Sequence, residues 1–188
     1  ATPEPGGTSH FVVIDRQGNV VSMTTTVESI FGSGRMVGGF FLNNQLTDFS
    51  FSPNDPDGAP AANAPGPGKR PRSSMAPTIV LTRDGRFVAA VGSPGGTSIQ
   101  AYNLKALVAL LDWKMAPQDA VALPNLVARG DRYSADRFPE PVMQGLAARG
   151  MPLSTGRGEE SGLQAVVRTR QGYEGGADPR REGRARGF

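Results

Sequence analysis

The residues that could act chemically begin with Thr8, which opens a Thr-Ser-His tripeptide, follows Gly6-Gly7 and precedes a β-rich run at 11–15. A threonine hydroxyl is a weak nucleophile unless a base lies beside it. One way to supply that base is to cleave the chain before the threonine, because the freed α-amine can then take the proton of its own side chain. The pattern fits such a cleavage site, although it is also typical of a turn that enters a strand.

A second group of hydroxyl side chains lies at 24–28 (TTTVE). Alternate residues of a strand point to the same face, so Thr24, Thr26 and Glu28 are predicted to point together. A threonine-rich face turned to solvent is an equally good interpretation.

Two polar clusters have the chemistry of a pocket for a zwitterion. In the first, at 43–48 (NNQLTD), Asp48 could face an ammonium group. In the second, at 69–75 (KRPRSSM), the paired hydroxyls of Ser73 and Ser74 suit a ligand carboxylate, which the nearby cations would help to hold. The alternatives are a solvated loop and a basic turn.

A glycine-rich loop at 92–96 (GSPGG) lies between a predicted strand and a predicted helix. Glycines there allow bare backbone N–H groups to approach a ligand oxygen near the positive end of the helix dipole. This is the chemistry of an anion site or an oxyanion hole. The phosphate interpretation is weaker because the lysine-serine part of a P-loop is missing, and a tight strand-to-helix turn is the alternative.

Composition excludes some classes of site and makes others less suitable. The 188 residues suit one domain or half of a larger one, and the formal net charge is only +3. The chain has no cysteine, so it forms no disulfide or thiolate metal site, and its single histidine, His10, is predicted to be structural rather than a general base.

A basic tail at 180–186 could bind nucleic acid, but no aromatic residue interleaves with its arginines. No apolar run reaches membrane-spanning length and no signal peptide opens the chain; if the chain is the C-terminal part of a longer precursor, the second absence does not bear on export.

These residues must be positioned by a layered α/β or α+β fold. Strands are predicted at 11–14, 20–26, 37–42, 78–82, 86–92 and 163–169, with a partner strand near Tyr173. Helices are predicted after a cap at Thr97 or Ser98, where apolar residues recur from 104 to 111, and at 117–122 and 141–149. The unpatterned stretch 51–68 is longer than a plain connector, and ordered loops of that length tend to be functional.

Taken in order, these motifs resemble the small subunit of γ-glutamyltranspeptidase (glutathione hydrolase), an N-terminal-nucleophile hydrolase. The resemblance runs over nearly the whole chain. Its carriers are the tripeptide at 8–10, Gly18-Asn19, Phe31-Gly32, LNNQLTDFS (42–50), KRPRSSMAPT (69–78), GSPGG (92–96) and ADPRREG (177–183). Several motifs in the right order at the right spacing are far more specific than any one of them.

The resemblance implies a four-layer αββα fold assembled from two subunits cut from one precursor, with residues 8–188 as the small-subunit domain and 1–7 as a segment before the cleavage site. It makes Gly7–Thr8 the cleaved bond and Thr8 the nucleophile, oriented by Thr26. The other implied roles are oxyanion binding by Gly95 and Gly96, and donor binding by Gln45, Asp48, Ser73 and Ser74. It implies no cofactor, metal or nucleic acid, a large subunit that supplies an arginine, a γ-glutamyl donor, an amino-acid, peptide or water acceptor, and a periplasmic or secreted location.

The chain departs from the family at three places. Glu28 stands where well-known members have asparagine, so it is either a second anchor for the ammonium or a mark of changed acyl specificity. The 51–68 loop lacks the tyrosine or tryptophan of many lids. With residues 1–7 attached, the Thr8 nitrogen is an amide, so this chain alone is expected to be inactive. A related acylase that acts on glutaryl or cephalosporin-type amides is the nearest alternative function, and a non-catalytic binding or structural domain is the alternative of another class.

Overall fold

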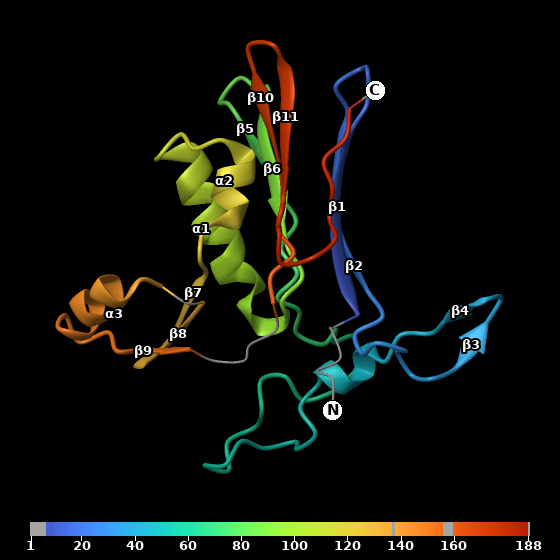
Figure 1. Cartoon of the computed structure of the whole chain (residues 1–188). Coiled ribbons are helices and arrows are strands. Elements are labelled where there is room, and N and C mark those ends of the chain that lie inside the picture. Colours follow the sequence, from blue (N-terminus) through green and yellow to red (C-terminus); the bar gives the residue numbers. More distant parts are fainter. Residues whose placement is uncertain (1–6, 137, 156–159, 188) are drawn as a thin grey trace.

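The computed structural model describes residues 7–136, 138–155 and 160–187 (Figure 1). The strands are β1 (Thr8–Ile14), β2 (Val20–Thr26), β3 (Met36–Val37), β4 (Phe40–Phe41), β5 (Thr78–Leu81), β6 (Phe87–Gly92), β7 (Leu126–Arg129), β8 (Arg132–Ala135), β9 (Leu153–Thr155), β10 (Gln164–Thr169) and β11 (Gly172–Ala177). The α-helices are α1 (Ile99–Leu111), α2 (Pro117–Ala122) and α3 (Glu140–Ala147), and the 3-10 helices are η1 (Gln45–Asp48) and η2 (Gly96–Ser98).

The predicted hairpin at the start of the chain is confirmed as β1 and β2, which pair antiparallel with Thr8 opposite Thr26. Its turn is stabilised by Asp15, whose carboxylate accepts hydrogen bonds from the backbone N–H groups of Gln17 (2.9 Å) and Asn19 (2.8 Å). Gly18 adopts φ 85° in this turn, a conformation that glycine enters without steric cost. The turn fixes the register and therefore brings the two threonines together at the other end of the hairpin.

The central sheet has the antiparallel order β11-β10-β6-β5, so the two other predicted hairpins form its two halves. α1 and α2 cover one face of this sheet, and the β1–β2 hairpin lies against the other face, in contact with β6 and β10 (Figure 1). The main core lies between the helices and the sheet and includes Val91, Ala106, Leu110, Val121 and Leu163. The chain thus forms three successive layers of an α-β-β stack.

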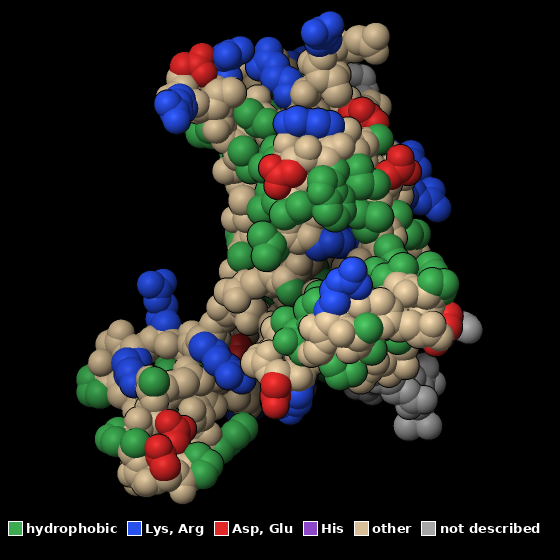
Figure 2. Space-filling model, turned by 90° about the vertical axis from the view of Figure 1, so that its left-hand side faces the viewer, with side chains coloured by type: hydrophobic (Ala, Val, Ile, Leu, Met, Phe, Trp, Pro, Cys, Tyr) green, Lys and Arg blue, Asp and Glu red, His purple; other side chains and the backbone are tan. Residues whose placement is uncertain are grey.

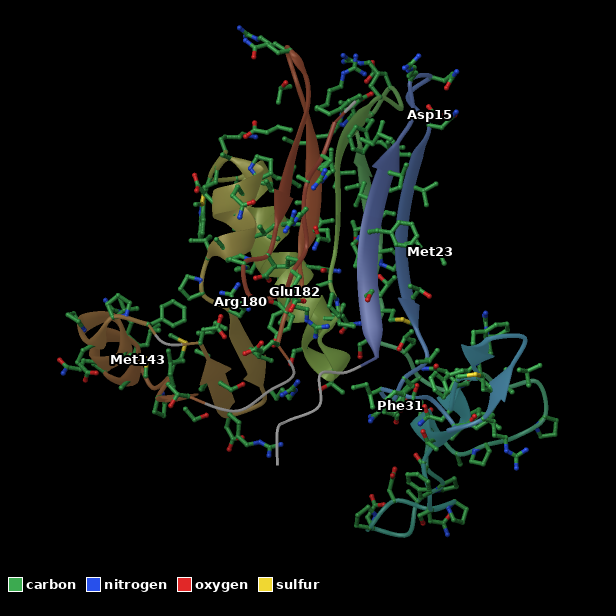
Figure 3. The ribbon with its side chains drawn as sticks, turned by 45° about the vertical axis from the view of Figure 1, so that its right-hand side comes forward. Asp15, Met23, Phe31, Met143, Arg180 and Glu182 are labelled. Carbon is green, nitrogen blue, oxygen red and sulfur yellow. The ribbon has the colours of Figure 1, made fainter. Side chains whose placement is uncertain are left out.

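The outer face of the β1–β2 hairpin is apolar and uncovered within the described residues. Phe11, Val13, Val21 and Met23 are 41–54% exposed there, and this face is turned forward in Figure 3, where Met23 is labelled. Alternation along both strands sends Thr8, His10, Thr24 and Thr26 to the opposite, inner face.

The side chains that α1 buries coincide only in part with the apolar repeat that predicted the helix. The apolar repeat from 104 to 111 predicted the helix, but Leu104 is 63% exposed, and the core-facing side is formed by residues such as Tyr102, Ala106 and Ala109. Small alanines allow the helix to lie close to the sheet, while Leu107 and Leu111 of the repeat pack against the core as partly buried side chains. No side chain caps this helix, although Thr97 or Ser98 was expected to do so.

Two further elements differ from expectation. The single strand expected at 37–42 is the short pair β3 and β4, because Gly38 and Gly39, at φ 59° and 89°, turn the chain back on itself. The small sheet β7-β8-β9 was not predicted, and its β8–β9 pairing is parallel. The predicted helix at 117–122 is confirmed by α2, and the one at 141–149 is confirmed in shorter form by α3.

On the helical side of the molecule, exposed hydrophobic side chains lie among charged ones, with Lys and Arg side chains gathered at the end that carries the β5–β6 and β10–β11 turns (Figure 2). Among the described residues, none of the helices is both long and apolar enough to cross a bilayer.

Candidate active site

The side chains of Thr8 and Thr26 meet at the open end of the β1–β2 hairpin. The Thr8 hydroxyl donates a hydrogen bond to Oγ1 of Thr26 over 2.9 Å, and both residues are half-buried. The same Thr26 oxygen accepts a second hydrogen bond, from the backbone N–H of Glu28, over 2.8 Å. Thr26 is therefore held by the backbone that follows β2, and it fixes the direction of the Thr8 hydroxyl.

The backbone before Thr8 is held by the same segment. The Gly7 N–H donates to the Glu28 carbonyl (3.0 Å), and the Gly7 carbonyl accepts from the Val27 N–H (3.4 Å). A Cβ at position 7 would lie 2.7 Å from the Ser29 carbonyl oxygen, so only glycine fits. Glu28 adopts φ 71°, which is uncommon for a residue with a side chain and tends to occur at functional sites.

The carboxylate of Glu28 is tied to the 43–48 cluster. Its Oε2 atom accepts hydrogen bonds from the Asn44 side-chain amide (2.7 Å) and from the Ser29 hydroxyl (2.8 Å). The Asn44 amide also donates to the hydroxyl of Thr47 in η1. Asn44 was not singled out by sequence as a site residue, and no local pattern marks it.

The two clusters that were predicted to bind a zwitterion line one pocket of about 310 Å³. The lining residues are Asn43, Gln45, Leu46, Asp48, Arg70, Pro71, Arg72, Ser73 and Met75. Within it, the Gln45 amide donates to the Asp48 carboxylate over 2.8 Å, and the Ser73 hydroxyl accepts from the Met75 N–H over 3.2 Å. Ser74 is half-buried beside this pocket but is not among its lining residues.

The glycine loop that follows β6 is shaped by close contacts that exclude side chains. A Cβ at Gly92 would overlap the imidazole of His10, and one at Gly95 would lie 2.5 Å from the ring of Tyr102. Gly95 and Gly96 adopt φ 134° and 50°. The loop is also held by the fully buried Ser93, whose hydroxyl accepts a hydrogen bond from the Gly162 N–H over 3.1 Å.

His10 connects the nucleophile strand to this loop. Its ring lies against Gly92, with Nδ1 2.9 Å from the Thr24 hydroxyl and Nε2 3.4 Å from the Ser22 hydroxyl. Burial lowers the pKa of His10 from 6.5 to about 4, so the ring is neutral at physiological pH. As predicted from the sequence, His10 is a buried structural residue.

The C-terminal segment reaches the same place through a buried ionic network. The fully buried Asp178 accepts hydrogen bonds from the Ser161 hydroxyl and from the Arg180 guanidinium (2.8 Å), which also donates to Asp136 (2.8 Å). Burial by itself raises the pKa of Asp178, but these hydrogen bonds hold that pKa below its ordinary value. The next residue, Arg181, donates to the Thr8 carbonyl over 3.2 Å. Sequence reasoning treated this tail as solvated or docked on a partner.

No group of three or more histidine, aspartate or glutamate side chains is placed to hold a metal ion within the described ranges 7–136, 138–155 and 160–187.

A hairpin that carries the candidate nucleophile, faces a second sheet and is backed by helices defines part of an N-terminal-nucleophile hydrolase. The chain belongs to the γ-glutamyltranspeptidase family, whose model matches residues 1–188. It is 39% identical over 190 residues to the glutathione hydrolase proenzyme of Bacillus subtilis strain 168, covering 97% of this chain and 31% of that protein. The chain thus spans about a third of the length of the curated relatives it matches.

The chain is also similar to solved structures of two related enzymes. The γ-glutamyltranspeptidase of Pseudomonas nitroreducens complexed with L-DON superposes with a TM-score of 0.81 at 33% identity, covering 95% of this chain and 98% of that chain. A cephalosporin acylase from Bacillus halodurans superposes with a TM-score of 0.78 at 26% identity, covering 93% of this chain and 33% of that chain. The resemblance in sequence motifs is thereby confirmed.

Proposed function

We propose that this chain is the nucleophile-bearing part of an enzyme that transfers or hydrolyses γ-glutamyl groups, with glutathione as one donor. The observation that carries the proposal is the hydrogen bond from the Thr8 hydroxyl to Thr26. Thr8 directly follows Gly7, a position where no side chain fits. A threonine held by a second hydroxyl and preceded by a cleavable bond has the parts that an N-terminal nucleophile needs.

Maturation is the first step of the proposed mechanism. The Thr8 hydroxyl attacks the Gly7 carbonyl carbon, the bond to the Thr8 nitrogen breaks, and an ester forms between Gly7 and the Thr8 oxygen. Water then hydrolyses this ester and leaves a free amine on Thr8. While residues 1–7 remain attached, the nitrogen is an amide and cannot act as a base, so the uncut chain is inactive.

In turnover, the Thr8 hydroxyl attacks the γ-carbonyl of the donor while its own α-amine accepts the proton. The N–H groups of Gly95 and Gly96 stabilise the resulting oxyanion, at about 3 kcal/mol per donor in comparable sites. The amine then returns its proton to the departing amine, and water or an amino-acid amine attacks the acyl-enzyme. No step needs a cofactor.

The pocket lined by the two polar clusters is the proposed place for the amino-acid end of the donor. Gln45 and Asp48 bind its ammonium group, and Ser73 with Ser74 binds its carboxylate. The pocket also contains the guanidinium-bearing residues Arg70 and Arg72, whose charge favours a carboxylate.

A second polypeptide completes the proposed enzyme. The apolar outer face of the β1–β2 hairpin, with Phe11 and Met23 at its centre, is the surface that this partner covers. Exposed apolar patches of this kind mark interaction surfaces. The partner is the large subunit from the same precursor, which provides the fourth layer and an arginine for the donor carboxylate.

An acylase for glutaryl or cephalosporin-type amides is the second candidate function. It is favoured by Glu28, whose carboxylate lies beside the 43–48 cluster, and by the structural similarity to the cephalosporin acylase. Glu28 stands where the family resemblance implies a neutral asparagine, so it changes the charge that the acyl chain of the donor meets. This candidate therefore predicts a preference for a glutaryl or cephalosporin-type amide over a γ-glutamyl anilide.

The test uses the full-length precursor with Thr8→Ala, and Thr25→Ala as a matched control on the exposed outer face. Thr8→Ala is expected to remain uncut by intact mass and to hydrolyse no γ-glutamyl anilide, while Thr25→Ala is cut and active. Efficient cleavage and turnover by Thr8→Ala would refute the mechanism. Preference of the matured wild type for a glutaryl amide would favour the acylase, and an uncut, inactive wild type would favour a binding domain.

A further inference from the structure

Arg181 lies where it can act on Thr8 through the backbone carbonyl of that residue. Its guanidinium donates to the Thr8 carbonyl (3.2 Å) and to the Glu160 carbonyl (2.9 Å). The stem passes over Gly162, where an added Cβ would lie 2.8 Å from both Arg181 Cδ and Pro94 Cγ. The half-buried cation is therefore placed between the nucleophile strand and the glycine loop.

The position of Arg181 is fixed by the residues before it. Its N–H donates to the Asp178 carbonyl over 3.3 Å, in a turn that Arg180 closes through the buried Asp178 carboxylate. A charge held this way keeps its place, whereas a cation on a freely moving tail is screened by water.

From this geometry we infer that Arg181 is a positioning residue that lowers the pKa of the Thr8 α-amine once that amine exists, an inference that rests on the proposed function. The amine and the carbonyl oxygen of one residue are about 3 Å apart by covalent geometry. The guanidinium nitrogen that binds this carbonyl therefore lies at most about 6 Å from the new amine, a separation at which a like charge disfavours the protonated form. Only the unprotonated amine can take the proton of the Thr8 hydroxyl.

Among the described residues, the other charged or titratable groups at this end of β1 act differently from Arg181. The carboxylate of Glu28, just beyond β2, acts in the opposite direction, and its hydrogen bonds with Asn44 and Ser29 tie it to the 43–48 cluster. His10 on β1 is neutral, and the side chain of Glu160 belongs to an exposed residue. Arg129 of β7 donates to the hydroxyls of Thr97 and Ser98, past the glycine loop.

The expected effect follows from Coulomb's law. At a separation of at most about 6 Å, in a half-buried site whose effective dielectric lies between protein and water, the cation lowers the amine pKa by about half a unit to one unit. An ordinary α-amine has a pKa of about 7.7 to 8.0. The cation thus brings the base close to neutral pH, where general bases work best.

The experiment measures kcat/KM for a γ-glutamyl anilide against pH in the matured full-length enzyme. Arg181→Gln is expected to move the acid limb up by about half a unit to one unit, which is about three- to tenfold lower kcat/KM on that limb. Arg181→Lys keeps the charge and the wild-type limb. Arg184→Gln, which removes a charge from an exposed position of the same tail, also keeps it.

Self-cleavage provides an internal control because the Thr8 nitrogen is then an amide that does not titrate. Its pH dependence is expected to be the same in Arg181→Gln and wild type. An unmoved acid limb in Arg181→Gln, an equal movement in Arg184→Gln, or a moved limb in Arg181→Lys would each overturn the inference. If Arg181→Gln does not mature, a moved acid limb in Arg181→Lys still overturns the inference. Turnover by Thr8→Ala in the same assay would instead remove the proposed function itself.

Discussion

Protonation of His10 is expected to loosen the contact between the nucleophile strand and the glycine loop. The imidazole is 7% exposed and lies against Gly92, with only hydroxyl partners, so the fold binds its neutral form. Lowering the pKa from 6.5 to about 4 corresponds to about 3 kcal/mol, at about 1.4 kcal/mol for each pH unit.

The sign of this effect follows from proton binding in the two states. Above pH 6.5 the ring is neutral in the folded and the unfolded chain, so the stability is fully present. As the pH falls from 6.5 towards 4, His10 becomes protonated in the unfolded chain but stays neutral in the folded chain, so the free energy of unfolding decreases. Below about pH 4 the loss levels off because both states are protonated.

The assay compares wild type with His10→Gln, whose amide can still reach a hydroxyl but does not titrate. Denaturant unfolding of both proteins at a series of pH values cancels the groups they share, and the wild type should lose about 3 kcal/mol more than the variant on acidification. The imidazole itself can be followed by NMR with labelled histidine, its signal identified by its loss in the variant. A ring that titrates near its ordinary value in the folded protein, or parallel pH dependences of the two proteins, would refute the reasoning.

Two further substitutions test the site and its support. Gly95→Ala should lower kcat of the matured enzyme by about a hundredfold, the effect of losing one oxyanion donor, because the new Cβ meets Tyr102 at a φ of 134°; wild-type kcat would show that this loop binds no oxyanion. Arg180→Met should cost about 3 to 5 kcal/mol in unfolding experiments because it leaves Asp178 buried without its cation. The control Arg86→Met breaks an exposed, solvent-screened ion pair and should cost far less stability; equal losses in the two variants would contradict the proposed role of burial.

The parts of the fold that sequence could predict are those with local signals. The β1–β2 hairpin follows from β-rich runs around a turn that Asp15 and Gly18 stabilise, and α2 follows from its proline and apolar pattern. The buried face of α1 could not be predicted because it depends on alanines packed closely on a sheet made from distant segments. The parallel pair β8–β9 has strands of only four and three residues, too short for a periodic signal.

The candidate site likewise has residues that local motifs indicate and contacts that depend on the fold. Thr8, Asp48 and Ser73 could be proposed as site residues from residue type and neighbouring motifs, and the pocket joins two clusters that were each polar enough to stand out. The contact of Arg181 with Thr8 joins positions 173 residues apart, and the Asn44 bond to Glu28 joins positions 16 apart, so only the folded chain reveals either contact.

That long separation also bears on the order of events during synthesis. A ribosome makes Thr8 early and the 178–181 turn much later, so the surroundings of Thr8 stay unfinished while the intervening chain emerges. We expect translation products that stop short of this turn to remain in one piece, since the backbone of the turn that packs beside the proposed Gly7–Thr8 cleavage site has not yet been added. The tail would then act as a checkpoint, coupling irreversible bond breakage to arrival of the late-made segment.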